Sequence, residues 1–463
     1  MNKRILKRIM ACLLLGTLGL PNGFGQLNLT MTNMHTLPQR IHLNPAQVSD
    51  SRLFISMPGL ASIHVLYNNT GFKIKELISV DDSNRLNIHP MSFYNSLNKT
   101  NRINLEADWD LIYFGFKLRK SNFTVCLSEK MKSQFSFPKD FFGLLLIGNA
   151  GQNLGQDLNF NFGYDLMAYN DISATYSRMF LKDKLRLGIK GAYLNGLLNV
   201  NTERSDLIFN TNSEDFHYTV RSDIKINTSC ILDTIKKGFE PGKWDYNVFK
   251  GRNKGMAISL GATYQLRPKV VLSASLVDWG YINWKDNVQN YQTRNPNENV
   301  EYYGLKLDDI FGDNPNPDSS YKALIDTIKA KMSLSTTHQS FKTSLPATIY
   351  LGGNFWLTKR HNIGVVMYGS YFRKKFNPAI TLSYNGKLTK IIGVSVSYSM
   401  INKSFVNGGV GLTLNGGPFQ YYAVADNILG IIKYKNANTV DLRMGINFTF
   451  LRKDKQAGLS GKK

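Results

Sequence analysis

The stretch that decides the fold is Val440-Asp441-Leu442-Arg443-Met444-Gly445-Ile446-Asn447-Phe448-Thr449-Phe450. Its even-numbered positions are apolar and large, whereas its odd-numbered positions are polar or small. This period of two is typical of a β-strand with one face on an apolar medium and the other on a polar one. The run also has the length, roughly 9–11 residues, that a tilted strand needs to cross the ~30 Å hydrocarbon layer of a bilayer. We interpret it as the strand that closes a transmembrane β-barrel.

The same alternation recurs along the chain and is separated by short polar turns. The clearest runs cover residues 112–118, 123–128, 184–193, 255–266 and 392–400. Strands of soluble β-sandwiches centre on about 5–6 residues, so the longer of these runs favour a membrane barrel. Polar pairs between runs, such as Lys182-Asp183 and Arg267-Pro268, are typical of tight hairpins. The pattern predicts an all-β fold, an antiparallel up-and-down transmembrane barrel of about 14 strands within a range of roughly 12–16.

Composition agrees with a barrel and excludes helical membrane spans. Aromatic side chains make up 12% of the 463 residues, and the mean hydropathy is slightly negative. No run of about 18 apolar residues exists beyond the N-terminus. The formal net charge is +23, but the basic residues are dispersed except in the tail. Dispersed charge argues against nucleic acid as a partner and favours anionic lipid headgroups or an anionic solute.

The chain divides into four predicted parts. Residues 1–25 carry the basic, apolar and small-residue regions of a secretory signal peptide, which with the barrel predicts the outer membrane of a Gram-negative bacterium. Residues 26–58 contain Asn44-Pro45-Ala46 and predict either a lead-in turn or a plug folded into the barrel mouth. The transmembrane barrel is expected at residues 59–451, with a long loop at 280–344, and a basic tail at 452–463.

Three stretches interrupt the strand pattern. Residues 135–153 include a Phe- and Leu-rich run without alternation, which predicts a short helix inside the barrel or at the membrane interface. Residues 227–254 form a polar, Lys-rich loop. The longest interruption, 280–344, includes a helical pattern between Tyr321 and Met332. Long loops with short helices are typical of the extracellular side of outer-membrane barrels.

No sequence pattern indicates catalysis, a cofactor or a metal. The seven histidines form no His-Glu-x-x-His pattern, and neither Gly-x-Ser-x-Gly nor a phosphate-binding glycine loop is present. Beyond the predicted signal peptide only Cys126 and Cys230 remain, too far apart for a disulfide framework or a metal-ligand spacing. We therefore expect no enzyme, no cofactor and no metal site, and a hydrolase at the barrel rim stands only as an alternative.

The faces of the predicted strands select the side chains that line the lumen. The candidates are Lys184, Arg186, Lys190, Asp441 and Arg443. Unpaired interior bases would attract anions, as in a channel for a small solute. Bases paired with inward acids would instead fill the interior. An apolar lumen closed by residues 26–58 would suit a hydrophobic solute, and a scaffold or secretion accessory that docks through residues 280–344 is the competing interpretation.

Several segments together resemble a large group of uncharacterised outer-membrane β-barrel proteins from Bacteroidetes-type bacteria. They are Leu37-Pro38-Gln39-Arg40-Ile41-His42-Leu43-Asn44-Pro45-Ala46, Pro58-Gly59-Leu60, Asn69-Thr70-Gly71-Phe72, Asp278-Trp279-Gly280-Tyr281-Ile282-Asn283-Trp284, Leu345-Pro346-Ala347 and Asp426-Asn427-Ile428-Leu429-Gly430. The Asn-Pro-Ala motif is also similar to that of FadL-like fatty-acid channels and the PorV-type barrels of type IX secretion. The resemblance implies fold and location but supplies no catalytic or ligand residues. The partners expected are outer-membrane lipid, a small or hydrophobic solute and other envelope proteins.

Overall fold

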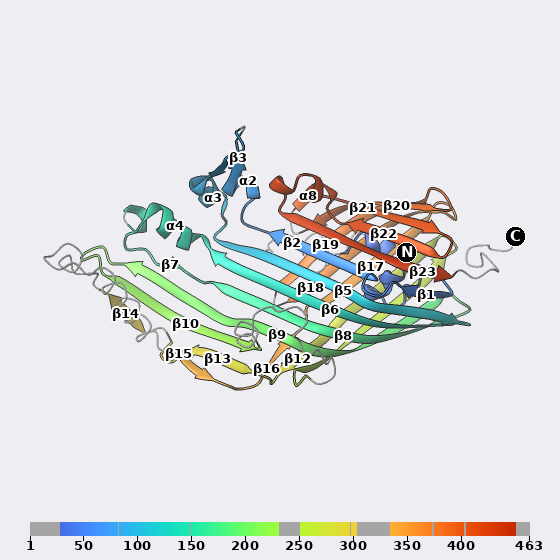
Figure 1. Cartoon of the computed structure of the whole chain (residues 1–463), viewed down its shortest axis with the longest axis horizontal. Coiled ribbons are helices and arrows are strands. Elements are labelled where there is room, and N and C mark those ends of the chain that lie inside the picture. The colour runs from blue at the N-terminus through green and yellow to red at the C-terminus, as the bar shows by residue number, and fades with distance from the viewer. Residues whose placement is uncertain are drawn as a thin grey trace, which may run out of the picture.

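The computed structural model describes residues 28–81, 83–149, 151–230, 251–296, 298–302, 334–372, 375–401 and 404–450. Within these ranges the dominant feature is one sheet of 21 strands that closes on itself (Figure 1). The predicted signal peptide, the helical pattern between Tyr321 and Met332 and the basic tail at 452–463 lie outside the described residues.

The barrel closes where the last strand meets the first. β23 (Thr439–Phe450), which contains the alternating run, is antiparallel to both β1 (Leu53–Ser56) and β2 (Ser62–Asn69). β1 and β2 act as one wall strand, because both also pair with β5 (Thr100–Leu118). The wall therefore begins at Leu53, earlier than the expected boundary at residue 59. A closed sheet leaves no unpaired backbone edge facing lipid.

From β5 the wall continues in chain order, each strand antiparallel to the next. Its members are β6 (Ser121–Pro138), β8 (Gly163–Phe180), β9 (Leu185–Thr211), β11 (Lys254–Arg267), β12 (Val270–Trp284), β17 (Ala347–Trp356), β18 (His361–Phe372), β19 (Lys375–Lys387), β20 (Ile392–Ile401), β21 (Ser404–Gly416) and β22 (Phe419–Ala425). Together with β5, β23 and the β1–β2 unit they form a closed 14-strand antiparallel barrel in the described part of the chain. The predicted fold class is confirmed.

On one side the sheet runs far beyond the barrel. β9 is 27 residues long: its first half pairs with β11, and its second half pairs with β10 (Tyr218–Ser229). Four short strands extend this part of the sheet: β13 (Val288–Thr293), β14 (Asn299–Tyr302), β15 (Leu334–Thr337) and β16 (Phe341–Ser344). We call this extension the tongue; it points left in Figure 1.

The tongue corrects the expectation of a loop over residues 280–344. Residues 280–284 continue β12, and β13 to β16 occupy much of the remainder. The physical reason is that β10 and β12 extend past the barrel with backbone groups that need partners, and the short strands supply them. Part of the predicted loop, residues 303–333, lies outside the described residues.

The opposite side of the barrel has short connections. The predicted hairpin at Lys182-Asp183 is a turn over residues 181–184, in which Leu181, Lys182 and Asp183 have φ of 47°, 52° and 69°. The connection between β21 and β22 contains Gly417 at φ 61°, a conformation that glycine adopts without strain. The first residues of the wall and the end of the described chain lie together on this side. The Arg52 N–H donates a hydrogen bond to the carbonyl oxygen of Phe450.

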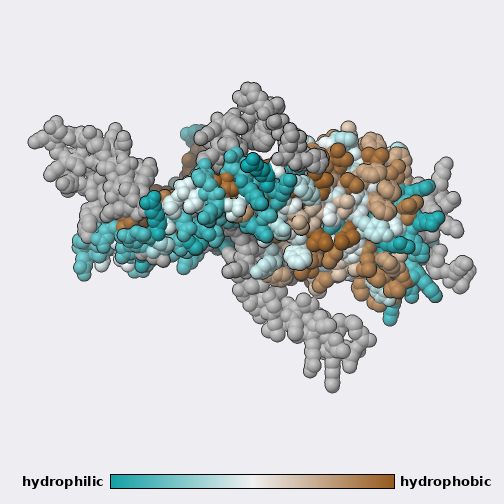
Figure 2. Space-filling view, turned by 90° about the horizontal axis from the view of Figure 1, so that it is seen from below, coloured by the Kyte–Doolittle hydropathy of each residue, from teal (hydrophilic) through white to brown (hydrophobic). Residues whose placement is uncertain are grey.

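The outward face of the barrel is apolar. Exposed wall residues include Val65, Trp109, Ile112, Leu187, Leu260, Leu272, Leu351, Leu382, Val396 and Tyr398. In the face shown in Figure 2, apolar side chains concentrate over the barrel, whereas polar ones dominate the tongue. The inward face is polar and buried, as Asp441, Arg443 and Asn447 illustrate on β23. An apolar belt around a polar interior is the arrangement of an outer-membrane barrel.

In the described ranges, helices are few and short. They are η1 (Met31–Asn33), η2 (Pro38–His42), α2 (Ile74–Leu77), α3 (Pro90–Ser96), α4 (Lys139–Ile147), η3 (Gly151–Asn153), α8 (Ile428–Ile432) and η4 (Tyr434–Asn436). α4 forms where the non-alternating Phe- and Leu-rich run predicts a short helix. β3 (Ile78–Val80) and β4 (Leu86–Ile88) make a separate hairpin, and β7 (Leu158–Asn159) pairs with β9. Among the described residues, no helix has the length and apolar character needed to cross a membrane.

The depth of the apolar belt can be tested with two leucines of equal exposure. Leu382 lies within β19 and is 55% exposed, while Leu388 lies in the following turn and is 56% exposed. Leu382→Arg should reduce the free energy of unfolding in lipid vesicles by ~2–4 kcal/mol, because the charge enters the middle of the hydrocarbon. Leu388→Arg should cost about 0–1 kcal/mol. Equal losses in denaturant unfolding would contradict this placement of the membrane.

Candidate functional site

The lumen is occupied by the N-terminal part of the described chain. Residues 28–50 lie inside the barrel, drawn in blue in Figure 1, and we call this segment the plug. Every residue from 28 to 49 is buried or half-buried. Leu29 and Leu37 are 0% exposed and Ile41 is 1% exposed, so solvent does not reach around these side chains. Residues 28–49 thus lie within the lumen, and β1 is already part of the wall.

The start of the plug is held by charged groups of the wall region. The Asp426 carboxylate accepts hydrogen bonds from the backbone N–H of Leu29 at 2.8 Å and of Thr30 at 2.9 Å. Nε of Arg443 donates to Oδ1 of Asn28 at 2.9 Å. Hydrogen bonds to ionised groups are stronger than those between neutral groups, so these contacts fix the first residues of the plug.

Asn44-Pro45-Ala46 forms the other contact of the plug with the wall. Oδ1 of Asn44 accepts from the Ala46 N–H at 2.8 Å, which closes a local turn. Nδ2 of Asn44 donates to the carbonyl oxygen of Ala274 at 3.2 Å, and Ser275 Oγ donates to the carbonyl oxygen of Leu43 at 2.7 Å. The turn thus binds β12 through its side chain and its backbone.

Two glycines in the wall make room for this turn. A Cβ at Gly188 would lie 2.4 Å from the carbonyl carbon of Pro45, and one at Gly261 would lie 2.1 Å from Oδ1 of Asn44. Contacts this short cannot exist, so any larger residue at either position would displace the plug or the wall. The wall sequence is therefore matched to the path of the plug.

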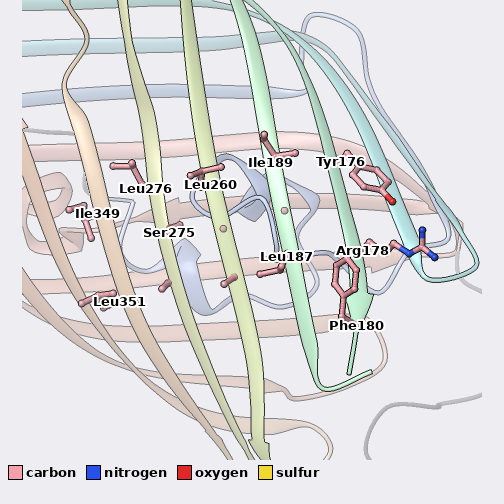
Figure 3. A pocket seen from close by; sticks show the side chains of 14 residues that line it. Tyr176, Arg178, Phe180, Leu187, Ile189, Leu260, Ser275, Leu276, Ile349 and Leu351 are labelled. Carbon is pink, nitrogen blue, oxygen red and sulfur yellow. The ribbon is translucent and has the colours of Figure 1, made fainter. Parts of the chain in front are cut away.

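On the lipid side of the same wall patch lies an open apolar recess of about 690 Å³. Leu187, Leu260, Leu276 and Leu351 surround it, and Figure 3 shows their side chains on neighbouring strands with the blue ribbon of the plug behind them. Ala262 pairs with Leu187 on one side and with Ala274 on the other. The recess exists because the side chains of Ala262 and Ala274 are small. A single backbone layer separates the recess from the Asn-Pro-Ala turn.

Two lysines and two aspartates form a buried group of charges that we call the ion quartet. Nζ of Lys130 lies 3.0 Å from Asp171 and 3.4 Å from Asp278, and Nζ of Lys190 lies 3.1 Å and 3.3 Å from the same two carboxylates. The four residues come from β6, β8, β9 and β12. Buried charges are tolerated when each has partners of opposite sign, and the quartet meets this condition. Interior bases here are paired with acids rather than free for anions.

A second buried group of charged residues lies beside the residues that hold the plug. We call it the histidine cluster, and its members are His64, Asp108, Asp441 and Arg443. Nε2 of His64 lies 2.8 Å from Asp441, and Nδ1 lies 3.4 Å from Asp108. Arg443 lies 3.2 Å from the same oxygen of Asp108. Asp441 also accepts the backbone N–H of Asp426 at 3.3 Å. The network therefore links the closing strand, the first wall strands and the residue that holds Leu29 and Thr30.

Between the plug, the ion quartet and the histidine cluster lies a cavity of about 30 Å³. Its lining includes His42, Asp108, Asp110, Asp278 and Arg443. A cavity of this size holds one or two water molecules at most. The described lumen is thus polar, charged and closely filled at this level.

The residues proposed as lumen-facing have different positions. Lys190, Asp441 and Arg443 are buried inside the barrel and carry the contacts above. Arg186 shares the face of Lys190 and is half-buried. Lys184 lies in the exposed turn at 181–184 and does not line the lumen, because β9 begins only at Leu185.

Several residues of the site were missed in the sequence. Asp108 and Lys130 lie on polar faces of alternating runs, so strand parity could have identified them as inward-facing. No local signal marks His42 or Asp426 as interior groups. Their positions depend on the path of the plug and of the connection after β22.

The anchor Asp426 predicts a pH effect. Burial, followed by the nearby Asp441 carboxylate, raises the pKa of Asp426 to about 6. The folded protein therefore keeps a proton that the unfolded chain releases near pH 4. Relative to Asp426→Asn, the wild-type protein should lose free energy of unfolding as the pH rises from about 4 to about 6, measured by urea titrations across this range.

The control for this effect is Asp81→Asn. Asp81 also accepts backbone N–H groups, from Ser83 and Arg85, but it lies in an exposed loop, and these hydrogen bonds lower its pKa. Its difference from wild type should be constant above about pH 5, because the group is ionised in both the folded and the unfolded state there. If the difference in free energy of unfolding between wild type and Asp426→Asn does not vary with pH, the assignment of a raised pKa to Asp426 is wrong.

Comparisons with known proteins identify a family. The profile of a family of unknown function, DUF5723, matches residues 45–426. A search of curated protein sequences finds no match. The chain is similar in structure to the Ralstonia pickettii toluene transporter TbuX, with TM-score 0.44, 9% identity and coverage of 92% of this chain and 98% of that chain.

Two further solved structures show a similar overlap. A Pseudomonas aeruginosa FadL homologue has TM-score 0.41 and 9% identity, with 90% of this chain and 94% of that chain covered. The Pseudomonas putida toluene transporter TodX has TM-score 0.37 and 8% identity, with 92% and 93% covered. These overlaps are too loose to transfer a substrate or a mechanism.

Proposed function

The chain belongs to the family of unknown function DUF5723, and we propose that it is a gated channel or transporter of the Gram-negative outer membrane, closed by its own plug. The observation that carries the proposal is the occupation of the lumen by residues 28–50. Side chains alone fill a barrel of about eight strands, and barrels of about 16–18 strands enclose an aqueous channel. A barrel of 14 strands needs an additional segment to be closed, and the plug supplies it.

The contacts of the plug suit a gate. Both ends of the plug are held by hydrogen bonds. At the start, Asp426 accepts from the Leu29 N–H and Arg443 donates to Asn28. At the Asn-Pro-Ala turn, the partners in the wall are Ala274 and Ser275. Each such bond has a net strength of about 0.5–1.5 kcal/mol, or about 1.5–3 kcal/mol when a charged group takes part. Displacing the plug does not require breaking any pair of wall strands.

The lining favours a small polar solute as the cargo of the lumen. The walls beside the plug carry the ion quartet and the histidine cluster, and such groups replace the hydration of a polar molecule rather than solvate an apolar one. The apolar recess favours a second candidate, a hydrophobic solute that enters from the lipid side at Leu187 and Leu351. Both candidates need the Asn-Pro-Ala turn to move.

The test is single-channel conductance in planar bilayers. The wild-type protein should be silent, and a variant without residues 28–50 should conduct steadily because the lumen is no longer filled. Gly188→Ala should show intermittent openings, since the new methyl group displaces Pro45. Correct folding is checked by heat-modifiable gel mobility.

Gly191→Ala is the matched control. Gly191 lies on the same strand, and a Cβ there meets no atom within 4 Å, so this variant should remain silent. Steady conductance of the wild-type protein would contradict the gate and indicate an open pore. Silence of the folded deletion variant would favour a scaffold that docks envelope proteins.

A further inference from the structure

Three potential metal ligands meet where the plug touches the wall. His42 ends η2 of the plug, Asp110 lies on β5 and Cys126 lies on β6. One ligand atom from each lies within 4.8 Å of the other two, and Nε2 of His42 is 3.1 Å from Oδ2 of Asp110. Asp110 and Cys126 are each 3% exposed. This grouping of nitrogen, oxygen and sulfur lies inside the barrel and shares no residue with the ion quartet.

We propose that His42, Asp110 and Cys126 form a binding site for a borderline divalent transition metal of the Zn²⁺ class, which ties the plug to the barrel wall. Zn²⁺ binds imidazole nitrogen and carboxylate oxygen at about 2.0–2.2 Å and thiolate sulfur at about 2.3 Å. Donors on one tetrahedral ion are then roughly 3.3–3.8 Å apart. The longest separation in the cluster must shorten by about 1 Å, which is a side-chain adjustment.

Neighbouring residues orient the ligands. Ser128 Oγ donates to Oδ1 of Asp110 at 2.7 Å, which leaves Oδ2 directed to His42. The same hydroxyl lies 3.2 Å from Sγ of Cys126. The ring of His42 stacks on Tyr113 with centroids 4.9 Å apart. Such outer contacts fix ligand geometry before the ion binds, as they do in established metal sites.

A water molecule in the neighbouring cavity would supply the fourth ligand of the metal ion. The cavity of about 30 Å³ borders His42 and Asp110, and it has room for a water molecule. Three protein ligands and one water form a common arrangement for Zn²⁺.

The metal site is a proposal separate from the gate, because metal binding can be measured on a protein whose lumen stays closed. Two ligands belong to the wall and one belongs to the plug, so the bound ion bridges the two. Without the ion, the plug and the wall would be joined at this point by the His42–Asp110 hydrogen bond and by the contacts of Tyr113 with His42 and Pro38.

The experiment is Co²⁺ binding, since Co²⁺ occupies zinc sites and its thiolate complexes absorb in the near ultraviolet. The chain without the predicted signal peptide is refolded in detergent with Co²⁺, and the bound metal is counted by mass spectrometry. We expect about one Co²⁺ per chain, a thiolate-to-cobalt absorption band, and displacement of the band by Zn²⁺.

Variants separate this site from other sources of binding. Cys126→Ser should abolish the band, and His42→Gln should weaken Co²⁺ binding at least tenfold. Cys230→Ser removes the other described cysteine and should change neither the band nor the affinity. Folded wild-type protein that binds no Co²⁺, or a band that survives in Cys126→Ser, would overturn the proposal. These readouts do not use conductance, so their failure is distinct from failure of the gate.

Discussion

The pairing of β23 with β1 and β2 is the constraint on which the rest of the structure depends. In hydrocarbon, a backbone N–H or C=O without a partner costs several kcal/mol, so a sheet that faces lipid must close. Closure with 14 strands creates an interior wider than wall side chains can fill. The polar inward face, the plug and the buried ion pairs all follow from that geometry.

The interior uses charge in balanced groups. Lys130 and Lys190 share Asp171 and Asp278, and Arg443 shares Asp108 with His64. Removing one member of such a group leaves a buried charge unpaired, which is more costly than losing the whole pair. Because Arg443 also contacts Asn28, the wall network and the plug are energetically coupled. A change in the plug is therefore felt in the wall.

Strand periodicity predicted the barrel and the inward faces of Asp441 and Arg443, because side-chain direction in a strand follows directly from position. It left the Asn44-Pro45-Ala46 segment open between a turn and a plug, since both need the same local geometry. Lys184 was misplaced by one position at the end of a strand, where turns replace alternation. The meeting of His42 with Asp110 and Cys126 could not be predicted, because it depends on how a non-repetitive segment crosses the lumen. The strands β13 to β16 of the tongue were missed because they are only four to six residues long.

The position of the plug in the chain constrains the order of folding. Leu29 is bound by Asp426, which is synthesised 397 residues later, and Gln39 is bound by Asn447, 408 residues later. The plug therefore gains these partners only when the last strands are in place. Non-local contacts of this kind form late and slowly. These anchors of the plug and the closure of the seam thus depend on the same last part of the chain.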